Sequence, residues 1–372
     1  MDATRKQHLN TVKTVVIKLG TQLLSDKDGR LDAAYVGEVA RQVAELRQRK
    51  IGVTIVSSGA VGAGLRELNL PKRPHDLAKL QAVAAVGQRR LMDVWADAFE
   101  PFTLPVAQVL LTREDIDDRT RFLNVRNTIH AAHELGAIPI VNENDTISTD
   151  EIVKITFGDN DILAALVASA LRADLLVLLT VVNGVLDAGG QTVSLVENVA
   201  QGRELVRAGE RSALGKGGMN SKFEAAKMVT DAGEALIVAN GRDENVLPRL
   251  LAGEALGTLF VPSPKKRSSR SRWIGAARPA GSIVVDEGAV TALTQRNRSL
   301  LAAGMTKVSG MFVAGDVVSI VDGSGKEIAR GLSNYASEDA HKICGKKTAE
   351  VHALLGDAAY DEVVHRDNLV LC

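Results

Sequence analysis

Residues 14–19 read TVVIKL, an apolar run that contains a single charged side chain, Lys18. Four further apolar runs follow, and aliphatic residues recur at helical spacing between them. These runs are residues 53–56 (VTIV), 138–141 (IPIV), 175–180 (LLVLLT) and 236–239 (LIVA). Because buried strands that alternate with helices form parallel sheets, we predict an α/β fold, with a mostly parallel open sheet sandwiched by helices.

The composition is that of a soluble globular protein larger than one ordinary domain, with 372 residues, 45% of them hydrophobic and 24% charged. The 45 Lys and Arg residues balance the 45 Asp and Glu residues, so no net field attracts nucleic acid or membrane. Two cysteines cannot form a disulfide framework, and the N-terminus has no apolar signal core. No apolar run is long enough to span a bilayer, so we expect a cytoplasmic protein with no membrane contact.

The amino-acid composition changes after Phe260. The stretch VPSPKKRSSRSRW is rich in proline, serine and positive charge, which is typical of a linker. Short strand candidates separated by glycine-rich turns begin near residue 280, with a helical piece near residues 337–343. We therefore expect a catalytic α/β domain at 1–262, a basic linker at 263–279 and a small β-rich domain at 280–372.

Polar side chains follow the predicted strands at the sheet edge where α/β proteins bind ligands. Lys18 ends the first strand, and a lysine buried there needs an anion unless its ammonium group reaches water. Ser58 and Gly59 follow the second strand in SSGAVGAG. Their turn either offers backbone N–H groups to an anion or serves close packing alone.

Carboxylates and amides gather in two further segments. The third predicted strand ends in NENDTI, which contains Asn142 and Asp145. This cluster could grip an ammonium group, although such runs also form ordinary turns. In FGDNDILAAL, Asp161 could cap a helix that starts at Ile162, but a cap does not explain the adjacent Asp159 and Asn160. Two carboxylates there could fix lysines or position magnesium.

The stretch ALGKGGMNSK, residues 213–222, resembles a phosphate-binding P-loop without matching its spacing. Gly217 and Gly218 still place backbone N–H groups near the start of a predicted helix, where anions bind. Lys222 would meet Lys18 at the same edge of the sheet. Two ammonium groups over a phosphoryl group provide the positioning and charge neutralisation that phosphoryl transfer needs.

Together these motifs resemble the amino-acid kinase family, most closely its members that phosphorylate glutamate. The resemblance covers nearly the whole chain. It depends on VVIKLGT, VSSGAVGAG, AAVGQRRL, LLTREDIDDRTRFLNVRNT, VNENDTI, FGDNDILAAL and GKGGMNSKFEAA. It implies ATP-dependent phosphorylation of the γ-carboxylate of L-glutamate, the first step of proline biosynthesis. The tail looks like a PUA domain.

The resemblance implies a role for each matching residue. Lys18 and Lys222 would offset the charge of the transferred phosphoryl group, and Asp161 would orient both lysines. The residues implied for glutamate are Ser58, Gly59, Asn142, Asp145, Asp159 and Asn160. Those implied for the nucleotide are Lys18, Thr180, Val181, Lys216, Gly217, Gly218, Met219, Asn220, Ser221 and Lys222. Mg²⁺ would bind through phosphate oxygens and water, without a dedicated set of protein ligands.

One segment departs from the family pattern. Val181 stands where the family has aspartate, and Leu186 stands where it has tyrosine. The missing carboxylate and ring belong to the nucleoside pocket, so the departure bears on nucleotide affinity and base preference. The residues expected to act in the transfer step are all present.

Two other functions remain open from the sequence. The first is a sibling kinase of the same fold acting on aspartate, acetylglutamate, carbamate or a nucleoside monophosphate. The second is an RNA-binding protein, which residues 280–372 do not favour because they hold more acidic than basic residues. His130 and His133 share a helix face without a further ligand cluster, so we predict no metal site. Homo-oligomers and feedback inhibition by proline are implied by the resemblance.

Overall fold

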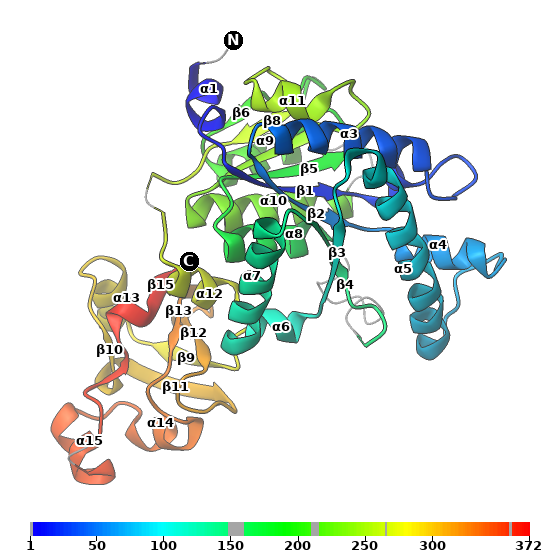
Figure 1. Ribbon diagram of the computed structural model, residues 1–372. Helices are drawn as coiled ribbons and strands as arrows, with labels where there is room; N and C mark the ends of the chain where they lie inside the picture. Colours follow the sequence, from blue (N-terminus) through cyan, green and yellow to red (C-terminus); the bar gives the residue numbers. More distant parts are fainter. Residues whose placement is uncertain (1–2, 148–159, 210–215, 265, 357–358) are drawn as a thin grey trace. The chain divides into compact units, whose positions relative to one another are not determined.

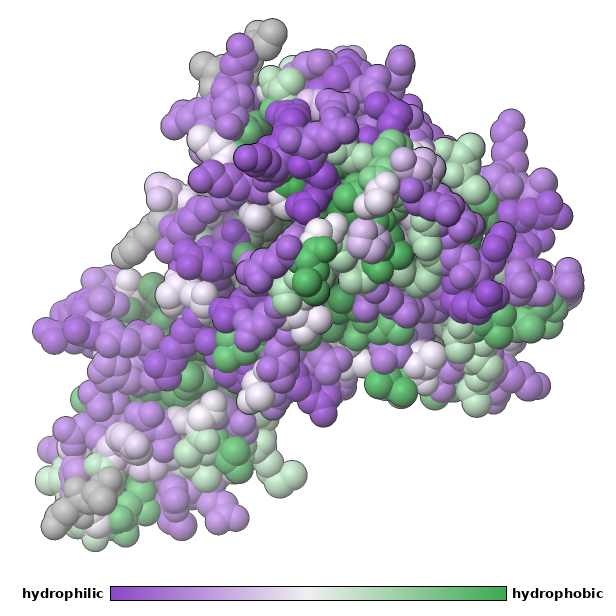
Figure 2. Space-filling model, viewed as in Figure 1, coloured by the Kyte–Doolittle hydropathy of each residue, from purple (hydrophilic) through white to green (hydrophobic). Residues whose placement is uncertain are grey.

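The computed structural model describes residues 3–147, 160–209, 216–264, 266–356 and 359–372. The chain divides into two compact units, residues 1–267 and 268–372, and each is described by itself. None of the described helices combines the length and the apolar character needed to cross a membrane. Hydrophobic and hydrophilic residues are interspersed over the face shown in Figure 2.

The first unit is built on an eight-stranded sheet within the described residues, with the strand order β3-β4-β2-β1-β5-β7-β8-β6. Every neighbouring pair is parallel except β7 and β8. The strands are β1 (Thr14–Leu19), β2 (Gly52–Ser57), β3 (Val106–Leu111), β4 (Ile138–Glu143), β5 (Leu175–Thr180), β6 (Leu195–Val196), β7 (Ala235–Asn240) and β8 (Thr258–Phe260). The predicted mostly parallel sheet is therefore confirmed.

The five strands predicted from apolar runs are β1, β2, β4, β5 and β7, and the structure contains all of them. Strands β3, β6 and β8 were not predicted. In β3 only Leu111 is buried, because this strand lies at the sheet edge and carries polar Gln108. β6 and β8 are two and three residues long, too short to give a periodic pattern.

Helices cover both faces of this sheet (Figure 1). Buried residues of α3, α5 and α11 form one core with the strands, and α8 contacts both α7 and α10 at the other face. The helices of the unit are α1 (Ala3–Leu9), α2 (Thr21–Leu24), α3 (Ala33–Gln48), α4 (Ala60–Glu67), α5 (Leu77–Phe99), α6 (Arg113–Asp117), α7 (Arg119–Glu134), α8 (Asn160–Leu171), α9 (Val199–Gly209), α10 (Lys216–Ala232) and α11 (Val246–Leu251).

The two-residue period of β1 decides where its lysine points. Val15, Ile17 and Leu19 belong to the core that contains α3. Side chains alternate between the two faces of a strand, so Lys18 points to the opposite face. Helix α8 covers β1 on that face. An ammonium group in this position meets the N-terminus of α8, because the carboxyl ends of the strands and the start of α8 share one edge.

Glycine allows α4 and α5 to pack at very short range. A Cβ atom added at Gly64 would lie 1.9 Å from the carbonyl oxygen of Val83, and one added at Gly87 would lie 1.8 Å from that of Ala60. Both distances are far below a real contact, so only glycine fits. This packing fixes α5 against the turn that follows β2.

We expect Gly64→Ala to lower the free energy of unfolding by about 3 kcal/mol, because a backbone carbonyl cannot yield to the added methyl group. The matched control is Gly62→Ala on the same helix, where nothing lies within 4 Å of the added carbon. That change is expected to stabilise the helix by about 0.5–1 kcal/mol. Urea unfolding followed by far-UV circular dichroism measures both, and equal effects would contradict the close packing of α4 and α5.

The second unit contains a five-stranded sheet with the order β11-β9-β12-β13-β15 and a two-stranded pair, β10 and β14. Its core includes Ile283, Val318 and Ile320. Its strands are β9 (Gly281–Val285), β10 (Leu300–Leu301), β11 (Met305–Gly310), β12 (Val317–Val321), β13 (Glu327–Leu332), β14 (Glu362–Val364) and β15 (Leu369–Leu371), and its helices are α12 (Ser269–Ala276), α13 (Glu287–Thr294), α14 (Ser337–Ile343) and α15 (Thr348–Leu355). The predicted β-rich character and the helix at 337–343 are confirmed.

The stretch expected to be a linker contains a helix. Residues 269–276 form α12, and its Trp273 and Ile274 are buried. The side chain of Ser268 accepts a hydrogen bond from the backbone of Ser271 and caps the helix. Residues 269–276 of this stretch are therefore helical, and the division between the two units lies at residues 267 and 268.

Candidate active site

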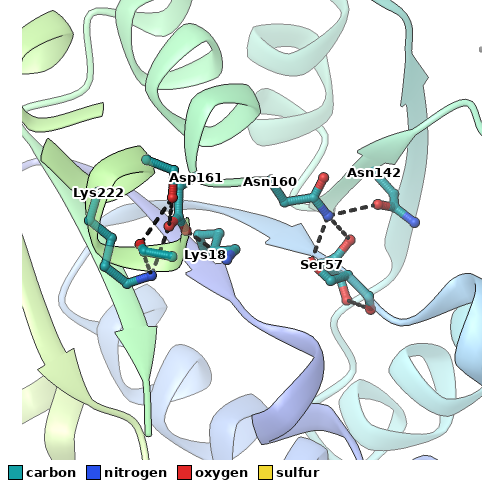
Figure 3. A network of polar contacts seen from close by, with 9 residues as sticks. Lys18, Ser57, Asn142, Asn160, Asp161 and Lys222 are labelled. Carbon is teal, nitrogen blue, oxygen red and sulfur yellow. Dashed lines mark hydrogen bonds and ion pairs between the residues drawn. The ribbon is translucent and has the colours of Figure 1, made fainter. Parts of the chain in front are cut away.

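Asp161 lies between two lysines at the carboxyl edge of the sheet (Figure 3). Its Oδ1 is 2.6 Å from Nζ of Lys18, at the end of β1. Its Oδ2 is 2.9 Å from Nζ of Lys222, on α10. One carboxylate therefore holds two ammonium groups, one on each oxygen, although the three residues lie on three different elements.

The Asp161 side chain is fully buried, and those of Lys18 and Lys222 are 8% and 12% exposed. Burial raises the pKa of the Asp161 carboxyl, but the charges and hydrogen bonds of the two lysines outweigh burial and hold this pKa below its ordinary value. The group of three therefore carries a net charge of +1, which favours an anion beside it.

Asp161 belongs to the first turn of α8, which begins at Asn160. The sequence also allowed it to be the cap of a helix starting at Ile162, but its oxygens bind the lysines instead. A carboxylate in the first turn interacts favourably with the helix dipole, which helps to keep it charged. At this position the helix dipole favours the charged carboxylate of Asp161, and the helix directs its two oxygens toward Lys18 and Lys222.

Helix α10 brings Lys222 and a group of backbone donors to the same place. The Lys222 ammonium group donates to the carbonyl of Gly218 at 3.1 Å, and the Ser221 hydroxyl donates to the same carbonyl at 3.0 Å. Ser221 also lies 3.3 Å from Oδ2 of Asp161. The helix begins at Lys216, so Lys222 is in the second turn and the N–H groups of the first turn precede it. These N–H groups favour phosphate.

A second polar cluster adjoins the first, because Asn160 directly precedes Asp161. The Asn160 amide donates to the hydroxyl of Ser58 at 2.7 Å and to Oδ1 of Asn142 at 3.1 Å. It also lies 3.3 Å from the Ser57 carbonyl. Asn142 in turn donates to Oε1 of Gln88 at 2.8 Å. The cluster thus joins β2, β4, α5 and α8 through uncharged groups.

A buried hydrogen bond from α5 fixes the end of β2, just before the turn that carries Ser58. Trp95 of α5 donates from its indole nitrogen to the Ser57 hydroxyl at 3.0 Å, and both side chains are buried. Gly59 has φ of 106°, a left-handed conformation that favours glycine. The Ser58 side chain is therefore presented by a rigid turn between β2 and α4.

Seven of the seventeen residues expected at the site lie in these two clusters. The structure brings together Lys18, Asp161, Ser221 and Lys222 in one, and Ser58, Asn142 and Asn160 in the other (Figure 3). Gly59 adjoins Ser58, and Gly218 accepts the hydrogen bonds of Lys222 and Ser221. Met219 and Asn220 lie on α10 between Gly218 and Ser221. Gln88 was not expected, and the only signal for it was the motif AAVGQRRL.

For the remaining expected residues, the structure gives either a position outside the two clusters or no description. Asp145 is half-buried and lies two residues beyond β4. Thr180 ends β5, and Val181 follows it with 45% of its surface exposed. Leu186 is 41% exposed. Asp159 lies outside the described residues, as does the side chain of Lys216; the backbone of Lys216 and Gly217 begins α10.

The two histidines of α7 differ in burial and in their contacts. His130 is exposed, and Nε2 of His133 is 2.9 Å from the hydroxyl of Thr54. Burial and the charges of Arg47 and His130 lower the pKa of His133 to about 4, so it is neutral at pH 7. Within the described part of the chain, no group of three or more His, Cys, Asp or Glu side chains could hold a metal ion.

The comparison with known proteins decides the family. The model of the amino acid kinase family matches residues 13–240, which contain both clusters. The chain belongs to the amino acid kinase family. A PUA domain model also matches residues 281–355, within the second unit.

Relatives along the full length narrow the assignment within the family. The protein from Syntrophotalea carbinolica is 42% identical over 374 residues, covering 99% of each chain. That from Citrifermentans bemidjiense is 45% identical over 374 residues, covering 99% of this chain and all of its own. That from Thermosynechococcus vestitus is 45% identical over 368 residues, covering 96% of this chain and 99% of its own. All three are named glutamate 5-kinase, and this chain groups with them.

Proposed function

We propose that this protein is a glutamate 5-kinase that transfers the γ-phosphoryl group of ATP to the γ-carboxylate of L-glutamate. The product is L-glutamyl 5-phosphate, and the reaction is the first step of proline biosynthesis. The observation that carries the proposal is that the carboxylate of Asp161 binds both Lys18 and Lys222. This pair of lysines lies beside the second polar cluster, called the amide cluster below. A cationic pair beside uncharged donors and acceptors suits a phosphoryl group and an amino acid held next to each other.

In the reaction, an oxygen of the γ-carboxylate attacks the γ-phosphorus, a new O–P bond forms, and the bond to the leaving oxygen of ADP breaks. Negative charge is spread over the phosphoryl oxygens in the transition state. The ammonium groups of Lys18 and Lys222 neutralise that charge, and neither has to move a proton. Asp161 keeps the lysines side by side, so that they do not reorganise when the charge develops.

We assign the glutamate to the amide cluster of Ser58, Asn142 and Asn160, with Asp145 beyond β4 as the partner of the α-ammonium group. The nucleotide phosphates are assigned to the first turns of α10 and to Lys18. The residues so assigned are Lys216, Gly217, Gly218, Met219, Asn220, Ser221 and Lys222, with Thr180 and Val181 beside the nucleoside.

Magnesium enters as part of the MgATP substrate. Asp161 is engaged by both lysines, so its oxygens are not free to ligate a cation, and the described residues contain no carboxylate cage. The donor set therefore fits a metal held mainly by phosphate oxygens and water. The cation would supply additional charge neutralisation on the phosphates.

The proposal extends to the setting of the enzyme. Homo-oligomeric assembly, a cytoplasmic location and feedback inhibition by proline are proposed from membership of the family. RNA is not proposed as a ligand of the second unit, because residues 280–372 contain nine basic and twelve acidic residues.

The test is trapping of the acyl phosphate with hydroxylamine in the presence of MgATP. We expect hydroxamate from L-glutamate and at least about a hundredfold less from aspartate or acetylglutamate, because a site built for one carboxylate spacing misplaces the others. Equal rates with aspartate would contradict the substrate assignment.

In the same assay, millimolar proline is expected to raise the KM for glutamate, and an unchanged KM would exclude the proposed feedback inhibition.

A further inference from the structure

Gln88 contacts the amide cluster from α5, and the mechanism above does not use it. Its side chain is 7% exposed, and its Oε1 accepts a hydrogen bond of 2.8 Å from Nδ2 of Asn142. Its Nε2 is buried and has no partner among the described residues. We propose that Gln88 is a positioning residue for glutamate, which holds the Asn142 amide in the orientation that the cluster needs. This inference rests on the proposed function.

The direction of each hydrogen bond in the cluster supports this role. The Ser57 carbonyl can only accept, so Asn160 must point its NH₂ group toward β2. Asn142 must then present its oxygen to Asn160, and its own NH₂ group turns toward α5. Gln88 supplies the acceptor at that point. The side-chain amides of Asn160, Asn142 and Gln88 therefore each have a single allowed orientation in this series of hydrogen bonds.

This orientation leaves two groups for a ligand. The Ser58 hydroxyl accepts from Asn160, so its hydrogen is available to donate. The oxygen of Asn160 points away from these contacts and can accept (Figure 3). A donor beside an acceptor complements a molecule that carries a carboxylate and an ammonium group close together, as an amino acid does. If Asn142 turned over, NH₂ groups would face each other and this arrangement would be lost.

The cost of burying Gln88 indicates that packing alone does not explain it. A buried amide donor without a partner costs about 1–3 kcal/mol, which an apolar side chain of the same length would avoid. The backbone at this position is also fixed, because the neighbouring Gly87 packs directly against the carbonyl of Ala60. Gln88 therefore approaches the cluster from a rigid support, which is what a positioning residue requires.

Three variants test the proposal. Gln88→Met removes the acceptor for Asn142 and keeps the length of the side chain, whereas Gln88→Glu keeps an acceptor oxygen. Gln42→Met is the matched control, because Gln42 is also buried at 3% exposure and hydrogen-bonded, to the backbone of Leu247 and to Glu38, outside both clusters. The readouts are KM for glutamate, KM for ATP and the midpoint of thermal unfolding, all with the full chain.

We expect Gln88→Met to raise the KM for glutamate about tenfold with the KM for ATP unchanged, and Gln88→Glu to raise it less. Gln42→Met should lower the unfolding midpoint without changing either KM. An unchanged KM for glutamate in Gln88→Met, or equal increases in both Gln88 variants, would overturn the positioning role while leaving the proposed function intact. A wild-type protein that does not phosphorylate glutamate would contradict the proposed function and this inference together.

Discussion

Replacing Lys222 by alanine is expected to lower kcat for glutamate phosphorylation by about a thousandfold. Lys222 is one of two ammonium groups bound to Asp161, and its charge is nearly buried, at 12% exposure of the side chain. A charge in such a site stabilises the transition state more strongly than one in water. The KM for glutamate should change little, since the uncharged cluster around Asn160 does not include Lys222. The hydroxamate assay gives both constants.

The control for this prediction is Lys227→Ala on the same helix. The Lys227 side chain is 50% exposed and pairs with Asp231 at 2.8 Å, an arrangement that contributes little to stability. We expect its kcat to match that of the wild type. A Lys222→Ala enzyme that keeps more than about a tenth of the wild-type kcat would show that the ammonium group is not part of the transfer step.

Asp161→Asn is expected to lower the free energy of unfolding by about 3–5 kcal/mol, because it leaves two buried ammonium groups without a counter-charge. The amide has nearly the same shape, so the loss reports on charge rather than on packing. The kcat should also fall, since the lysines then repel each other and leave their positions. Urea unfolding at pH 7 and the hydroxamate assay measure the two effects.

The difference between the Asp161→Asn variant and the wild type should depend on pH in one direction. The pKa of Asp161 is lower in the folded protein than in the unfolded chain. Its stabilising contribution is therefore fully present above the unfolded pKa of about 4, and it is lost as the pH falls through the folded pKa. We expect the difference in unfolding free energy to be constant from pH 7 to about 5 and to shrink below about 4. A difference that grows on acidification would mean that Asp161 is not held charged by the lysines.

Sequence reasoning predicted that Lys18, Asp161 and Lys222 lie together because charge is conspicuous in an apolar environment. Lys18 interrupts a buried strand, and Asp161 starts an apolar helix, so each needs a partner that only the fold can provide. The carboxyl ends of parallel strands meet at one edge, which predicts that such residues converge there. The pairing of one Asp161 oxygen with each lysine is a matter of side-chain geometry, and it emerged only from the structure.

Gln88 and α12 show what the sequence did not predict. Gln88 lies in the middle of a long helix, where glutamine is more often exposed than buried. Its contact with Asn142 spans 54 positions in sequence and depends on how α5 packs against α4. In the stretch expected to be a linker, serine and arginine dominate the composition, yet Trp273 and Ile274 are buried and their helix α12 packs against β13 and β15. Tertiary packing decided both cases.

The most direct test of phosphoryl transfer to the side-chain carboxylate uses glutamate labelled with oxygen-18 in its γ-carboxylate. The enzyme acts on it with MgATP, and hydroxylamine then attacks the carbonyl carbon of the product and releases phosphate. If the γ-carboxylate attacks the phosphorus, each released phosphate carries one labelled oxygen, which shifts its signal in ³¹P NMR. Released phosphate without the label would mean that water attacks ATP instead, and it would contradict the assignment of the two-lysine site to glutamate phosphorylation.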